Sequence, residues 1–166
     1  MFENVDLNKL FDTESDYGKG YIYGTLTDEM IARAEQSIGY TFPKSYIELL
    51  KFQNGGIMSD DLSDECWITA IYGIGETESA FNGIEEMFVN WIEEWEYPNI
   101  GIPFGETQSA GHDMYFMDMR ELDANDEPSI VRIENEGDPE DARIIKIADN
   151  LEEFLKMIID GDNIYN

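Results

Sequence analysis

Apolar residues recur at helical spacing in the segment that follows residue 26. The positions that share this face are Met30, Ile31, Ala34 and Ile38. Thr27 precedes the run, and its hydroxyl can accept a hydrogen bond from a backbone N–H of the first turn. Gly39 follows the run and can adopt the left-handed conformation that ends many helices. The pattern predicts an α-helix between Thr27 and Gly39.

A second helix is predicted to begin at Pro43. A proline favours the first turn, because its ring fixes a helical φ angle and the N–H that it lacks has no partner there. The apolar face of this helix consists of Tyr46, Ile47, Leu49 and Leu50. Asn54, Gly55 and Gly56 end it, since these residues tolerate positive φ angles at little steric cost. Residues 26–56 are therefore expected to form a helix pair.

Shorter apolar runs bounded by turn residues predict strands farther along the chain. The expected strands are residues 67–74, 100–104, 114–119, 129–133 and 144–148. Pro103 cannot donate a hydrogen bond to a neighbouring strand, so its strand should lie at a sheet edge or contain a bulge. The last two strands flank an acidic connection, residues 134–141, and are expected to form a hairpin with a mobile tip.

Two further helices complete the pattern. The first covers residues 84–95, and its apolar stripe consists of Ile84, Phe88, Trp91 and Trp95. The second starts at Asn150 with Glu153 in a pattern like a capping box and ends at Gly161. The order of elements predicts the α+β class, with an N-terminal helix pair, a mostly antiparallel central sheet, and a C-terminal helix packed on the sheet.

The length of the chain and its apolar content indicate one domain. A chain of 166 residues with 42% hydrophobic residues can bury a core without disulfides or metals. Residues 1–24 are expected to form an arm that docks on this domain, which comprises residues 25–166. Apolar residues in the arm have a spacing compatible with a short amphipathic helix: Phe2, Val5, Leu7, Leu10 and Phe11.

Acidic residues far outnumber basic ones. The chain has 37 Asp and Glu against 10 Lys and Arg, and its formal net charge is −27. No Lys or Arg occurs between Lys51 and Arg120. Nucleic acid and anionic membranes are poor direct partners, because binding phosphates requires cations. A cationic protein is a natural partner, since complementary charge speeds association. Alternatively, the charge serves only to keep the protein soluble.

Features of export or membrane insertion are lacking in the sequence. The first residues are acidic and have neither the basic nor the apolar region of a secretory signal. No apolar run approaches the ~18 residues required to cross a bilayer. Cys66 is the only cysteine and cannot form an internal disulfide, which is consistent with a reducing compartment. We therefore expect a cytoplasmic protein.

Catalytic and metal-binding chemistry have little support. His112, the only histidine, adjoins Asp113, so an acid-base role with Glu106 or Asp113 is conceivable, although a lone loop histidine rarely has one. No nucleophile-elbow sequence surrounds Cys66 or His112. Residues 59–65 concentrate oxygen ligands, yet they lack the alternating order and central glycine of an EF-hand loop. We expect no catalytic residue, metal or cofactor.

A set of motif residues stands at the predicted helix ends and turns. It consists of Glu35, Gly39, Pro43, Asn54, Gly55, Gly56, Pro103 and Gly111. With Tyr46 and Phe104, the order and spacing of this set resemble the SUKH superfamily (Smi/Knr-like), over most of the chain. The resemblance implies a bacterial immunity protein that neutralises a toxin made by the same cell, by binding and without catalysis. The motif residues themselves are expected to hold the fold rather than to contact a ligand.

The implied toxin is basic, and a nuclease fits because nucleases bind polyanions through basic clefts. The acidic residues expected to contact it are Asp60, Asp61, Asp64, Glu65, Glu106 and Asp113. Trp91 or Trp95 would add an aromatic anchor if exposed, since binding energy concentrates at such residues. Their position on the apolar stripe favours core packing instead.

Two other functions stay open at this point. The eukaryotic branch of the same superfamily suggests an intracellular adaptor or regulatory module that binds proteins. The carboxylates of Glu106 and Asp113 leave a small hydrolase conceivable. Capture of one toxin encoded by a neighbouring gene would favour immunity, whereas recovery of several housekeeping proteins would favour an adaptor.

Overall fold

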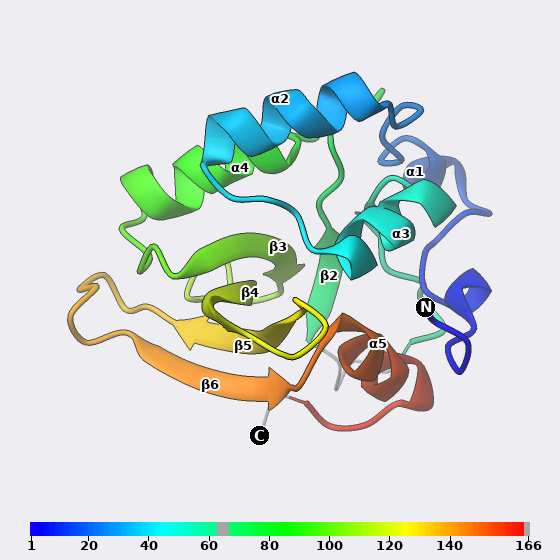
Figure 1. The fold of residues 1–166 in the computed structure, drawn as a ribbon. Coiled ribbons are helices and arrows are strands. Elements are labelled where there is room, and N and C mark those ends of the chain that lie inside the picture. The colour runs from blue at the N-terminus through cyan, green and yellow to red at the C-terminus, as the bar shows by residue number, and fades with distance from the viewer. Residues whose placement is uncertain (63–66, 165–166) are drawn as a thin grey trace.

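A single antiparallel sheet forms the centre of the fold (Figure 1). The computed structural model describes residues 1–62 and 67–164. Each strand pairs with the next strand along the chain, so the spatial order is the sequence order. The strands are β1 (Gly56–Ile57), β2 (Ile68–Ile71), β3 (Gly101–Thr107), β4 (Asp113–Leu122), β5 (Pro128–Glu134) and β6 (Arg143–Ala148).

Helices precede the sheet, interrupt it after β2, and follow it. They are η1 (Leu7–Lys9), α1 (Asp16–Lys19), α2 (Asp28–Ile38), α3 (Lys44–Phe52), α4 (Ile84–Val89), the π-helical η3 (Asn90–Glu94) and α5 (Leu151–Asp160). Figure 1 shows α2 beside α4, and α5 contacts β5 and β6. The predicted α+β architecture is confirmed, including the C-terminal helix on the sheet.

The predicted ends of α2 are confirmed by their hydrogen bonds. Thr27 Oγ1 accepts a hydrogen bond from the N–H of Met30 at 3.2 Å, and this bond satisfies one of the free donors of the first turn. Gly39 has a φ of 78° and ends the helix in the left-handed conformation. The next helix, α3, begins at Lys44, so Pro43 stands just before its first turn rather than inside it.

The start of α3 is capped by a residue from the turn between β4 and β5. Pro43 provides no side-chain cap. The buried Glu127, in the turn between β4 and β5, accepts a hydrogen bond at Oε1 from the N–H of Ser45 at 3.1 Å, and its other oxygen accepts from the Ser45 hydroxyl. A carboxylate stabilises a helix N-terminus because it faces the positive end of the helix dipole. This long-range contact fixes α3 against the β4–β5 turn.

Two motif residues fasten backbone segments between elements. Glu35 Oε1 accepts a hydrogen bond from the N–H of Phe42 at 2.8 Å, across the link between α2 and α3. Asn54 Nδ2 donates to the carbonyls of Gly24 and Ile74 at 2.7 and 2.8 Å. Asn54 Oδ1 accepts from the N–H of Ile74 at 2.9 Å. Both side chains therefore satisfy backbone groups that lie outside regular structure.

Neighbouring residues of β4 mark the two faces of the sheet. Tyr115 contacts Phe154 of α5, with ring centroids 5.0 Å apart. Phe116 stacks on Tyr97, with centroids 5.7 Å apart. Because successive side chains of a strand point to opposite faces, α5 covers one face and the segment after η3 covers the other. Both rings of β4 are fully buried, so the sheet is packed on both sides.

The edge position considered for Pro103 is wrong, and the bulge is right. β3 lies between β2 and β4, in the interior of the sheet. The register with β4 shifts between Pro103 and Gly105, so an irregularity accommodates the residue that has no N–H to donate. β2 is also shorter than the predicted strand over residues 67–74.

The segment before α2 lies along one edge of the sheet. Leu10 and Phe11 are buried in the core. The carbonyl of Leu10 accepts a hydrogen bond from Ser59, and the N–H of Asp12 donates to the carbonyl of Ile57, each at 2.9 Å. These bonds cover the outer edge of β1. Between Phe2 and Phe11, where the spacing is compatible with a short amphipathic helix, the structure has only the 3₁₀ turn η1. The helical turn α1 follows later, and the domain boundary at residue 25 stays a prediction.

Candidate functional site

The predicted contact residues occupy different parts of the structure. Asp60 and Asp61 are exposed after β1 and line a hollow that they share with residues of the N-terminal segment, including Asp12 and Glu14. Asp64 and Glu65 lie outside the described residues, as does Cys66. The remaining predicted contacts belong to β3, to the start of β4 and to η3 with the residue that follows it.

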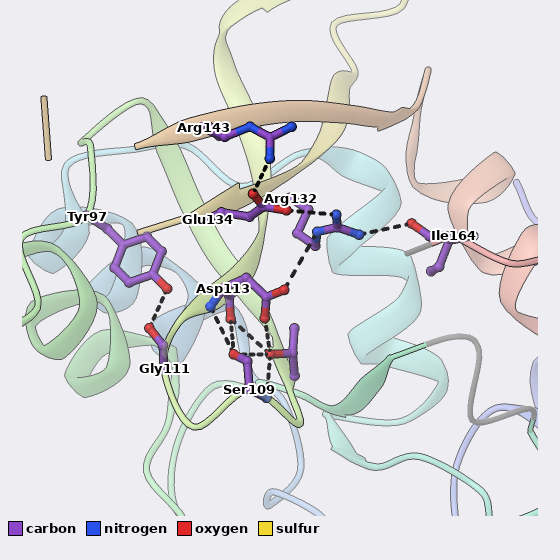
Figure 2. A network of polar contacts seen from close by, with 9 residues as sticks. Tyr97, Ser109, Gly111, Asp113, Arg132, Glu134, Arg143 and Ile164 are labelled. Carbon is purple, nitrogen blue, oxygen red and sulfur yellow. Dashed lines mark hydrogen bonds and ion pairs between the residues drawn. The ribbon is translucent and has the colours of Figure 1, made fainter. Parts of the chain in front are cut away.

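Asp113 is an internal residue rather than a surface acid, and Figure 2 shows the polar network around it. Only 2% of it is exposed. Its Oδ1 accepts a hydrogen bond from Thr107 Oγ1 at 2.6 Å, and its Oδ2 lies 3.7 Å from the Nε of Arg132. The N–H of Asp113 donates to Ser109 Oγ at 2.9 Å. Because its charge already faces a buried guanidinium, Asp113 is not available to meet a partner at the surface.

Arg132 links three parts of the chain in the same network (Figure 2). Its Nη2 donates to Glu134 Oε1 at 3.1 Å, and its Nη1 donates to the carbonyl of Ile164 at 3.3 Å. Glu134 in turn accepts at Oε2 from Nη1 of Arg143 on β6, at 2.9 Å. A buried arginine requires such compensation, since a charge without partners inside a protein is strongly destabilising. The network therefore holds β4, β5, β6 and the C-terminal segment together.

Glu106 belongs to a second internal network, on β3. Its Oε2 accepts a hydrogen bond from the Tyr72 hydroxyl at 2.8 Å. Burial raises the pKa of Glu106 above its usual value, and the hydrogen bond from Tyr72 opposes that shift. The Tyr72 oxygen also accepts from Nε1 of Trp91 at 3.0 Å. This chain of hydrogen bonds gives Glu106 a partner inside the protein.

The two tryptophans of the predicted stripe differ in exposure. Trp91 is 7% exposed, so the core-packing interpretation is right for it. Trp95 is 44% exposed, so that interpretation is wrong there. The N–H of Trp95 donates to the carbonyl of Asn90 at 3.0 Å, a bond to the fifth preceding residue that is typical of a π-helix. This wider turn and the end of η3 at Glu94 leave Trp95 at the rim of the fold.

Trp95 rests on a specific backbone surface. A β-carbon placed on Gly111 would come within 2.7 Å of Trp95 Cζ3, so the indole lies directly against this glycine. The Trp91 ring lies on another side, with centroids 5.4 Å apart. The carbonyl of Gly111 accepts a hydrogen bond from the Tyr97 hydroxyl at 2.6 Å, which fixes the loop that supports the ring (Figure 2).

Asn135 joins the segments that surround Trp95. Its Nδ2 donates to the carbonyl of Trp95 at 3.0 Å, and its N–H donates to the carbonyl of His112 at 2.8 Å. Asn135 is 5% exposed. Sequence reasoning placed it in the acidic connection after β5 and gave it no role. Its one local signal is the glycine two residues later, because the N–H of Gly137 donates to Asn135 Oδ1 at 3.2 Å in an Asx-type turn.

These segments form a surface that we call the Trp95 corner. Its residues are Glu94, Trp95, Glu96, Gly111, His112, Asn135 and Glu136. The side chains of Glu94, Glu96 and Glu136 are exposed. His112 Nδ1 lies 3.5 Å from Glu136 Oε2, and both side chains face solvent. The corner thus combines one exposed aromatic ring with several exposed acidic residues of the segments that meet there.

The residues named for a hydrolase engage separate partners. Glu106 binds Tyr72, Asp113 binds Thr107 and Arg132, and His112 faces Glu136. Among the residues that the structure describes, no group of three or more His, Cys, Asp or Glu side chains is placed to hold a metal ion. In the same part of the chain, no helix combines the length and apolar character needed to cross a bilayer.

Comparison with known proteins identifies the family. The model of the SMI1 / KNR4 family (SUKH-1) matches residues 25–157, which is most of the chain and includes every strand and the helices α2 to α5 except the last residues of α5. No curated protein sequence matches the chain. The match agrees with the resemblance seen in the motif residues. The chain therefore belongs to the SMI1 / KNR4 family (SUKH-1).

Proposed function

We propose that this protein is a cytoplasmic immunity protein that binds and neutralises a basic toxin, through acidic side chains on its surface. Proteins of the SUKH family are commonly non-catalytic immunity proteins for polymorphic toxins. A nuclease is the toxin class that we favour, because a nuclease must bind a polyanion through a basic cleft. An acidic protein can occupy such a cleft in place of the nucleic acid.

The observation that carries this proposal is the uncompensated charge. Even if every Lys and Arg neutralised one acid, 27 acidic side chains would have no Lys or Arg as a partner. Such an excess lowers the stability of a folded protein through self-repulsion. The excess has a use if the partner is cationic, because complementary charge raises association rates from ~10⁵–10⁶ to ~10⁸–10⁹ M⁻¹s⁻¹. Rapid capture suits the inhibition of a lethal enzyme.

The internal networks narrow the surface that can carry this function. Asp113 and Glu106 have partners inside the protein, so we no longer propose them as direct contacts. The exposed acids at Asp60 and Asp61 and those of the Trp95 corner remain available. The corner also offers an exposed aromatic ring, and interfaces concentrate their binding energy at such residues.

Survival assays with a co-expressed toxin test the proposal. Each toxin gene that neighbours the gene for this protein is expressed in a susceptible bacterium, with and without the protein. We expect survival only when the protein is present, together with inhibition of the purified toxin and an association rate that falls steeply with added salt. Failure to protect against any neighbouring toxin would remove the immunity function. Recovery of several housekeeping proteins in its place would favour the adaptor.

A further inference from the structure

The Trp95 ring packs against Gly111 and Trp91, yet the residue stays largely exposed. Trp95 is 44% exposed, whereas Trp91, whose ring lies beside it, is only 7% exposed. Exposed tryptophans are uncommon on protein surfaces, and they are enriched where partners bind. Trp95 is one of several large apolar residues that the described structure leaves exposed, and it is the most exposed tryptophan among them.

The ring is also held in place before any partner arrives. The backbone of Trp95 is fixed at its N–H by Asn90 and at its carbonyl by Asn135, both at 3.0 Å. The side chain lies against Gly111 and Trp91, which restrict its rotamers. A side chain that is already ordered loses little conformational entropy on binding, so more of its contact energy contributes to affinity.

The exposed acidic residues of the Trp95 corner favour a cationic ligand over an apolar or anionic one. Glu94 and Glu96 flank Trp95 in the chain, and Glu136 adjoins Asn135; all three are exposed. No Lys or Arg occurs in the segments that form the corner, residues 94–96, 111–112 and 135–136. Their one histidine, His112, lies 3.5 Å from Glu136. The arginines nearest in sequence are both paired with Glu134. An apolar partner would desolvate these carboxylates without compensation, and an anionic partner would be repelled.

Among cations, the guanidinium group of arginine fits best. It stacks on an indole face, and it can donate two parallel hydrogen bonds to a carboxylate at the same time. The ammonium group of lysine offers a point charge without this planar match. We propose that the Trp95 corner binds an arginine side chain of the cationic partner, with the ring on Trp95 and its donors toward Glu94, Glu96 or Glu136. This inference rests on the proposed function, because that function supplies the partner.

Fluorine NMR of the whole protein tests the inference without the toxin. The chain has three tryptophans, so protein labelled with 5-fluorotryptophan gives three signals that single Trp→Phe variants assign. The probes are a hexa-arginine amide and a hexa-lysine amide, titrated at low salt. We expect the Trp95 signal to shift, with the arginine peptide bound about two- to fivefold more tightly than the lysine peptide, as stacking on an exposed indole predicts.

Two sets of variants separate the ring from the charge. Trp95→Phe keeps an aromatic ring over Gly111 and should weaken binding of the arginine peptide. Trp95→Ala should abolish the preference of the protein for the arginine peptide over the lysine peptide. The triple variant E94Q/E96Q/E136Q should weaken binding of both peptides at the corner. The matched control, E3Q/E14Q/E121Q, removes the same number of exposed charges elsewhere and should leave the Trp95 shift in place. Thermal unfolding of each variant confirms that it is folded.

Several outcomes would overturn the inference. The first is a Trp95 signal that does not shift when the arginine peptide is added. The second is equal affinity for the two peptides. The third is a loss of peptide binding in the control variant E3Q/E14Q/E121Q as large as the loss in E94Q/E96Q/E136Q. The toxin assay distinguishes this failure from failure of the proposed function. A Trp95→Ala protein that still protects cells fully would refute the anchor and leave immunity intact. A wild-type protein that protects against no neighbouring toxin would refute immunity whatever the peptides do.

Discussion

The indole ring of Trp95 lies directly against the backbone of Gly111, so that a methyl group at residue 111 would clash with the ring. The virtual β-carbon lies 2.7 Å from Cζ3 of Trp95, and the φ of Gly111 is 97°. Two independent constraints therefore require glycine at this position, one steric and one conformational. The relationship joins Gly111 to the most exposed tryptophan of the described structure.

We predict that Gly111→Ala destabilises the protein and displaces the Trp95 ring. The unfavourable φ alone should lower the free energy of unfolding by about 1–3 kcal/mol, and the clash with the ring adds to this. Urea unfolding measures the loss. The control is Gly24→Ala, since Gly24 has no atom within 4 Å of its virtual β-carbon and no positive φ. A variant at residue 111 as stable as this control would contradict the geometry.

Asn54→Ala should be among the most destabilising single changes at a polar residue. It removes hydrogen bonds to the carbonyls of Gly24 and Ile74 and from the N–H of Ile74. Each buried group left without a partner costs about 1–3 kcal/mol, so a total of about 3 kcal/mol or more is expected in urea unfolding. Asn8→Ala, at an exposed residue whose amide binds only Asp6, should change stability little. Equal losses of stability in the two variants would show that the hydrogen bonds of Asn54 do not stabilise the fold.

The helix ends could be predicted because their causes are local. Thr27, Gly39, Asn150 and Gly161 act on backbone groups within four residues of themselves, and the structure places each at the predicted end. The exposure of Trp95 could not be predicted in this way. The apolar stripe assumes a regular α-helical turn, whereas the chain widens to a π-helix before it ends.

The candidate site was harder to predict because its contacts join distant segments. Nothing beside Asp113 in the sequence indicates that Arg132, on the next strand, neutralises it. Asn135 has the composition of a loop residue, yet its amide reaches back to Trp95, 40 residues earlier. Composition shows the excess of acidic residues, and only the fold shows which of these residues are exposed and which have partners inside the protein.

Asp113→Asn tests the buried ion pair. The amide can still accept from Thr107, but the guanidinium of Arg132 loses its buried counter-charge. Breaking a buried pair from one side costs about 3–5 kcal/mol, and we expect the lower end because Glu134 also binds Arg132. Asp141→Asn, at an exposed acid, should stay within about 0.5 kcal/mol of wild type. A loss at residue 113 as small as this would mean that the pair is dispensable.

Self-repulsion predicts that salt stabilises the protein. With a net charge of −27, the folded state brings many like charges close together. The screening length falls from ~30 Å at 0.01 M salt to ~10 Å at 0.1 M, so most of the relief should occur in this range. Thermal unfolding at 0.01 to 0.3 M NaCl should show a rising midpoint that levels off, and KCl should give the same curve. An unfolding midpoint that stays constant or falls with added salt would mean that repulsion among the carboxylates does not destabilise the folded state.

The pH dependence of stability should carry the signature of Glu106. Burial raises the pKa of this carboxyl, and the hydrogen bond from Tyr72 only partly opposes the shift. The folded state therefore binds the proton more tightly than the unfolded state does. As the pH rises from the usual glutamate value of 4.5 through the raised folded pKa, the unfolded state loses its proton first, so stability falls across this window and then stays lower.

Glu106→Gln removes this loss while keeping an acceptor for the Tyr72 hydroxyl. The stability of the variant relative to wild type should therefore increase from pH 4 to pH 7, when urea unfolding is measured at constant ionic strength. Glu94→Gln changes the net charge equally at an exposed position and corrects for long-range repulsion. If the two variants gain equally with rising pH, the effect comes from overall charge, and the buried environment of Glu106 contributes nothing to it.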